Sequence, residues 1–224
     1  MSLKTELQAA IDYCNTKLTG KGAQTASTVY GIGDKIETIQ TGGGFPDDDY
    51  IYINPYQASL RGAFPSTSLP SDITLDISKA TIIDLYSAFA TPSISGSDTL
   101  TSITLKGSTA SATNFELFIA RRANIEEIDG ALDFSSINSD NQRPFFENRA
   151  LVEVRFVQNS IKRSMTFVNS PLLSDDSVVS IVNGLATVSG KTLTMHSTVK
   201  DKITGGQISG ITEASITSKG WTLA

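Results

Sequence analysis

Leu100-Thr101-Ser102-Ile103-Thr104-Leu105 is the stretch that decides the fold, because the chain repeats its hydrophobic pattern. Related phrases begin at Ile125 and at Leu151, which lie 25 and 26 residues further along in turn. A constant period in the twenties predicts that each copy contributes one strand and that stacked copies bury one another's apolar side. Each copy also follows an aromatic landmark: Phe89, then Phe115 and Phe118, then Phe145 and Phe146.

This pattern is typical of leucine-rich repeats, so we expect an α+β protein built on a short leucine-rich-repeat-like β solenoid. We expect residues 45–170 to form the solenoid and residues 171–224 to form an α/β cap over its last repeat. Residues 1–44 would be a helical hairpin for attachment or oligomerisation. The second copy is imperfect, because Gly130 stands where the final hydrophobic residue is expected.

The composition is that of a globular protein, and it excludes some partners. Of the 224 residues, 39% are hydrophobic and 18% are charged, which separates the chain from disordered sequences. The net charge of −5 argues against a nucleic-acid-binding surface. We find no signal peptide and no apolar stretch long enough to span a bilayer, so no membrane partner is expected. The localisation stays open, with a virion as one option.

Residues 1–40 have the pattern of two amphipathic helices, and the triglycine at 42–44 follows them. Two short helices are not stable alone in water, so their apolar faces must pack on the repeats or on another chain. A homo-oligomer formed through residues 1–40 is therefore one expectation. The single cysteine, Cys14, excludes an internal disulfide and lies on the apolar face of the first helix.

Alternation of apolar and polar residues predicts further strands at 50–54, 73–77, 165–167 and 193–195, and a short helix is expected near 82–86. Ser174 is placed to cap a helix whose first turn holds Asp175 and Asp176, acids that suit the helix dipole. Short helical turns are expected at 199–203 and 208–216. Trp221 and Leu223 would then cover the end of the core.

Few residues point to chemistry. The one histidine, His196, has Ser197 and Asp201 nearby in sequence, so a hydrolase that uses His196 is a remote alternative. No G-x-S-x-G motif accompanies it, and the histidine and cysteine counts exclude a metal site built from those residues. We therefore expect a protein that is not an enzyme and that has no cofactor and no bound metal.

Arginines give the one distinctive charge pattern, since six of the seven lie within the repeats. Guanidinium groups form forked hydrogen bonds, so a row of them on one face would bind an anionic glycan or a partner protein. The alternative is that they pair with interleaved acids: Glu116, Glu126, Glu127, Glu147 and Glu153. The residues that would form such a binding surface are Arg121, Arg122, Arg149, Arg155 and Arg163.

Over residues 80–170 the repeated phrase, with its aromatic-bearing turn, resembles the BspA-like leucine-rich-repeat proteins of bacterial surfaces and phages. Residues 7–15, 30–36 and 216–223 resemble small proteins encoded near tail genes in prophages of Firmicutes. The resemblance implies a virion-associated tail or baseplate protein that presents a repeat surface to a protein or a host-surface glycan. A bacterial adhesin-like surface protein is the alternative. Such proteins usually carry export signals, which favours the phage interpretation.

Overall fold

The computed structural model describes residues 49–94, 98–140 and 142–224. The chain divides into two compact units, Met1–Pro46 and Asp47–Ala224, and the described residues all belong to the second. The expectations for residues 1–44, including oligomerisation through residues 1–40 and the place of Cys14, lie outside the described residues.

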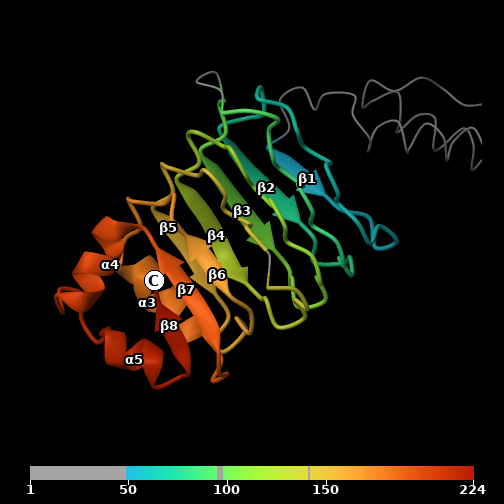
Figure 1. Ribbon diagram of the computed structural model, residues 1–224. Helices are drawn as coiled ribbons and strands as arrows, with labels where there is room; N and C mark the ends of the chain where they lie inside the picture. The colour runs from blue at the N-terminus through green and yellow to red at the C-terminus, as the bar shows by residue number, and fades with distance from the viewer. Residues whose placement is uncertain (1–48, 95–97, 141) are drawn as a thin grey trace, which may run out of the picture. The chain divides into compact units, whose positions relative to one another are not determined.

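Five short strands lie side by side in chain order, and every neighbouring pair is parallel (Figure 1). In each of the three copies the strand begins two residues after the first hydrophobic residue of the phrase. The middle hydrophobic residues Ile103, Ile128 and Val154 are therefore in register and buried. The strands are β1 (Tyr50–Tyr52), β2 (Asp72–Asp76), β3 (Ser102–Lys106), β4 (Glu127–Leu132) and β5 (Glu153–Phe156).

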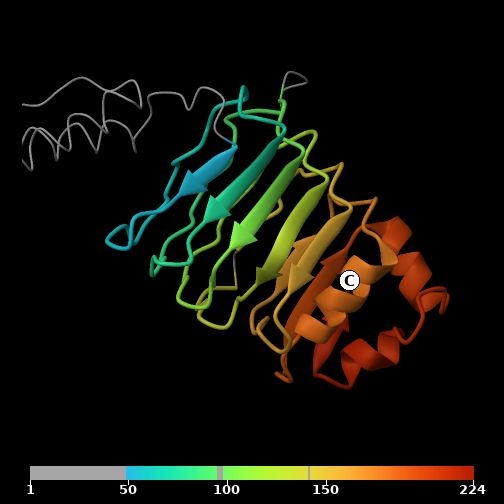
Figure 2. The same cartoon turned by 180° about the vertical axis from the view of Figure 1, so that it is seen from behind.

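A second parallel sheet of three strands follows, and helices connect its strands (Figure 2). Parallel strands need a crossover between them, and a helix is the usual connection. The strands are β6 (Met165–Phe167), β7 (Lys191–Met195) and β8 (Trp221–Leu223). The helices are α3 (Asp175–Gly184) between β6 and β7, and α4 (Ser197–Thr204) and α5 (Glu213–Thr217) between β7 and β8.

The expected fold class, an α+β leucine-rich-repeat-like β solenoid with an α/β cap, is wrong. The described chain has two parallel sheets of five and three strands with few helices, which is an α/β-like arrangement. The hydrophobic phrase determines where a strand lies and which side it buries. It does not determine the connections, which beyond β6 are helical and join the strands of a separate sheet.

Several local predictions are confirmed, and one is wrong. Strands occur at each predicted position, and the Ser174 side chain caps α3 by accepting a hydrogen bond from the Ser177 N–H. The short helix expected near 82–86 is absent. There the Asp84 carboxylate accepts a hydrogen bond from the Tyr86 N–H, and Ser87 has a φ of 52°. Both features belong to a tight turn, because a side-chain acceptor and a left-handed residue each compete with helical geometry.

The imperfect second copy is accommodated by a bulge in β4. Ile128 pairs with Val154, but Leu132 and not Gly130 pairs with Phe156, so the buried position is filled two residues late. Gly130 has a φ of 101°, and a Cβ there would lie 2.7 Å from the Leu105 carbonyl oxygen. Only glycine fits this position without strain.

Phenylalanine rings form a continuous chain through the core and join the two sheets. Phe64 stacks on Phe89 at 4.7 Å between centroids, and Phe89 meets Phe118 edge to face at 5.9 Å. The chain ends in the second sheet, where Phe156 of β5 meets Phe167 of β6 at 6.2 Å. The rings between these are Phe115 and Phe134. The aromatic landmarks of the sequence therefore pack the successive copies against one another.

Helix α3 covers the edge of the five-stranded sheet with its serine hydroxyls. The Ser177 oxygen accepts a hydrogen bond from the Val154 N–H at 2.9 Å, and the Ser180 oxygen accepts one from the Phe156 N–H at 2.9 Å. Serines three residues apart share one helix face. Together their hydroxyls accept hydrogen bonds from alternate N–H groups of β5, which a further strand would otherwise bind.

This arrangement makes Ser177 a stability determinant. Its side chain is fully buried, so Ser177→Ala leaves the Val154 N–H without an acceptor, and we expect a loss of about 1–3 kcal/mol in the free energy of unfolding. Urea denaturation measures the change. Ser189→Ala, at an exposed position, is the control and should change the value by no more than about 0.5 kcal/mol. Equal effects of the two substitutions would show that α3 does not protect this edge.

Candidate functional site: a polar groove beside the second sheet

A ladder of backbone hydrogen bonds runs along the side of the molecule opposite the strands, and the candidate site lies where a side chain interrupts it. Leu60 N–H donates to the Asp84 carbonyl at 2.9 Å, and Leu85 N–H donates to the Asn114 carbonyl at 2.8 Å. In the next copy the Phe115 N–H donates instead to the side-chain Oε1 of Gln142 at 2.5 Å. A buried side chain here replaces a backbone carbonyl, and the backbone ladder resumes where the Ile119 N–H donates to the Pro144 carbonyl at 3.1 Å.

A groove of about 650 Å³ lies at this interruption, between the Glu116 turn, residues 139, 140, 142 and 143, and strands β6 and β7. This volume is within the range of small-molecule sites. Hydroxyl side chains dominate its wall: Ser139, Ser164, Thr166, Thr192 and Thr194. The hydroxyls of Thr192 and Thr194 have no hydrogen-bond partner among the described residues, so they are available to a ligand.

The strands hold these hydroxyls in a fixed pattern. Thr192 and Thr194 lie on the same side of β7, while Leu193 and Met195 between and beyond them are buried. Thr166 pairs with Thr194 across the sheet. Neighbouring strands are about 4.8 Å apart and alternate residues about 6.6 Å apart, so the three hydroxyls form a small grid on a rigid support.

Each carboxylate of the groove wall is ion-paired. Asp140 lies 2.8 Å from the Lys191 ammonium and also accepts a hydrogen bond from the Ser164 N–H at 3.0 Å. The Lys191 ammonium and the Ser164 N–H together hold the pKa of the Asp140 carboxyl below its usual value. Glu116 lies 3.0 Å from the Arg143 guanidinium and accepts the Arg143 N–H at 2.7 Å. The groove is therefore polar, and its charged groups compensate one another.

The solvent side of the five-stranded sheet is a weaker candidate, since many of its polar groups already bind one another. The Asp72 carboxylate accepts hydrogen bonds from the hydroxyls of Ser102 and Ser71, both at 2.7 Å. Asp76 accepts from the Ser78 N–H and from the Tyr50 hydroxyl, and these bonds lower the pKa of its carboxyl to about 2. We therefore place the candidate site in the groove.

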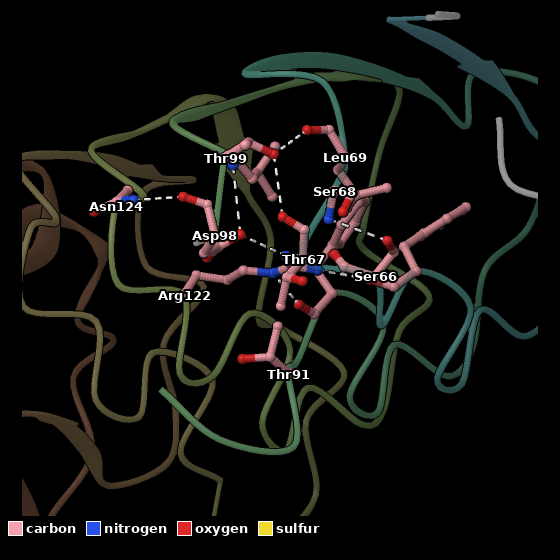
Figure 3. Close-up of polar contacts among 12 residues, drawn as sticks. Ser66, Thr67, Ser68, Leu69, Thr91, Asp98, Thr99, Arg122 and Asn124 are labelled. Carbon is pink, nitrogen blue, oxygen red and sulfur yellow. Dashed lines mark hydrogen bonds and ion pairs between the residues drawn. The ribbon is translucent and has the colours of Figure 1, made fainter. Parts of the chain in front are cut away.

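Arg122, one of the arginines expected on a binding surface, is fully buried (Figure 3). Its Nη1 lies 2.8 Å from Asp98 Oδ1, and neither side chain is exposed. The guanidinium also donates to three backbone carbonyls of the two preceding copies, those of Phe64, Ser66 and Phe89. Burial lowers the pKa of the guanidinium, and the pair with Asp98 opposes that shift. Arg122 thus links neighbouring copies through its hydrogen bonds. Because it is buried, it cannot take part in a surface contact.

The remaining arginines of the expected surface are scattered. Arg121 pairs with Glu147 at 3.1 Å, and Arg163 donates to the Ile137 carbonyl at 3.3 Å. Arg149 and Arg155 are exposed and make no side-chain hydrogen bond with a described residue. Pairing with interleaved acids, the alternative interpretation, is confirmed for Arg121 and Arg143. None of the five predicted residues lines the groove.

His196 caps helix α4. Its Nδ1 accepts a hydrogen bond from the Thr198 N–H at 3.2 Å, which satisfies one of the free N–H groups at the start of the helix. This is its only side-chain hydrogen bond with a described residue, so the structure does not join it to Ser197 or Asp201.

Residues 49–94, 98–140 and 142–224 contain no group of three or more His, Cys, Asp or Glu residues placed to hold a metal ion. Within the same ranges, no helix has both the length and the apolar character needed to cross a bilayer.

Comparison with known proteins finds no match: no family model, no curated protein and no solved structure is significantly similar to this chain.

The buried ion pair between Arg122 and Asp98 gives a second test of the fold. Arg122→Met keeps much of the side-chain volume but leaves the Asp98 carboxylate buried without a counter-charge, so we expect a loss of about 3–5 kcal/mol in the free energy of unfolding. Arg149→Met, at an exposed position, should change it by no more than about 0.5 kcal/mol. Chemical denaturation compares the two. A similar small change in both variants would contradict the role assigned to Arg122.

Proposed function

We propose that this chain is a non-enzymatic binding module, a virion-associated component of a phage or prophage tail, whose groove binds a host-surface glycan or protein. The observation that carries the proposal is the groove itself, about 650 Å³ lined mostly by polar side chains. Two strands hold its threonine hydroxyls, and those of Thr192 and Thr194 on β7 have no partner among the described residues. The association with phage tails is supported by the resemblance of residues 7–15, 30–36 and 216–223 to prophage-encoded proteins.

Two further observations favour binding over catalysis. The one histidine caps a helix, and the carboxylates of the groove are held in ion pairs with Lys191 and Arg143. A general acid or base needs a pKa near the working pH, and the pKa of Asp140 is shifted away from it. The groove therefore has the features of a recognition site.

Binding of the full-length protein to purified Firmicute cell walls tests the proposal. We expect saturable binding, and Thr194→Arg should weaken it at least tenfold, about 1.4 kcal/mol, because the long cation fills the groove. Thr104→Arg is the matched control, since Thr104 is a half-buried threonine on β3 of the other sheet. Its binding should equal that of the unmodified protein.

Three results would contradict the proposal. One is the absence of saturable binding. Another is an equal effect of the two arginine substitutions, which would place the contact away from the groove. The third is release of soluble fragments from the cell walls during incubation, which would indicate an enzyme. Circular dichroism of each variant establishes that the fold is retained.

A further inference from the structure

From the groove's chemistry we infer the class of its ligand: an uncharged oligosaccharide. This inference rests on the proposed binding function and deepens it. Sugar hydroxyls both donate and accept hydrogen bonds, so their site must offer donors and acceptors side by side. The groove does so with the threonine hydroxyls of β6 and β7, each of which can both donate and accept.

The rigidity of this wall favours a ligand that is held by many weak hydrogen bonds. Thr166, Thr192 and Thr194 are β-branched residues on paired strands, so both their backbone and their side-chain torsions are restricted. A site whose groups are already ordered loses little conformational entropy on binding. Such a site can hold an oligosaccharide even though each hydroxyl contributes little.

The charges of the wall favour a neutral ligand over an ionic one. Glu116 is paired with Arg143, and Asp140 is paired with Lys191. A ligand carrying sulfate or carboxylate groups would have to displace one of these carboxylates from its partner. A neutral sugar can bind beside the pairs and accept or donate hydrogen bonds without breaking them.

An extended peptide fits the groove less well. Peptides that add to a sheet need an open strand edge and pockets for apolar side chains. Strand β7 is paired on both sides. The edge strand β6 has only three residues, and the Ser164 N–H that precedes it already donates to the Asp140 carboxylate. The one apolar residue of the wall, Met165, is only 3% exposed. The groove therefore offers a peptide only a short strand edge and no apolar pocket.

A glycan array carrying neutral and acidic oligosaccharides tests the inference, followed by calorimetry with the best neutral member. We expect the full-length protein to bind short neutral oligosaccharides of hexose and N-acetylhexosamine units. The affinity should change less than about twofold between about 0.05 and 0.5 M NaCl, because no ion pair forms with the ligand. Binding only to acidic oligosaccharides, or a steep salt dependence, would overturn the inference.

The double variant Thr192→Val/Thr194→Val locates the contact. It removes the two unpartnered hydroxyls but keeps side-chain shape and strand preference, so binding should weaken at least tenfold while the fold is retained. Thr104→Val is the matched control and should bind as the unmodified protein does. Unchanged binding in the double variant would overturn the inference.

The two proposals can fail separately. If Thr194→Arg abolishes cell-wall binding while no neutral oligosaccharide binds, the groove remains a binding site and the inferred ligand class is wrong. If cell-wall binding survives Thr194→Arg, the proposed function itself fails.

Discussion

Register between the parallel strands is the constraint on which the rest of the structure depends. Because side chains alternate across a strand, a slip of one residue would turn the hydrophobic column Ile73, Ile103, Ile128 and Val154 towards solvent. The chain holds this register even where its own pattern departs from the repeat. The bulge at Gly130 absorbs the departure and returns the next hydrophobic residue to the core.

Two sets of hydrogen bonds hold the strands of the five-stranded sheet in place, one from helix α3 at its edge and one from the buried Arg122. Helix α3 uses the hydroxyls of Ser177 and Ser180 to satisfy the last strand of the five-stranded sheet, so that sheet ends there. Arg122 binds carbonyls of two preceding copies as well as Asp98, so one side chain joins three copies. The groove lies beside this stack, at the point where the Gln142 side chain interrupts the backbone ladder.

The strand positions could be predicted from the sequence because alternation of apolar residues is a local property. The fold class could not, since the phrase at Leu100 says nothing of the connections between strands. Arg121 and Arg122 were both expected on the surface, yet Arg121 lies in a turn with a φ of 62°, and only the structure shows that the Arg122 side chain is buried. The groove could not be predicted from any pattern in the sequence. Its threonines are ordinary strand residues, and Gln142 is distinguished only by its place.

The molecule thus combines a rigid stack of strands with one polar groove whose charges are compensated, which suits recognition of an uncharged, hydroxyl-rich surface. Titration of the isotope-labelled full-length protein with the best neutral oligosaccharide, followed by amide chemical shifts, tests this account most directly. We predict that the shifted signals cluster at Gln142, Thr166, Thr192 and Thr194. Shifts that cluster instead on the solvent side of β1–β5, or no shifts at saturating ligand, would contradict it.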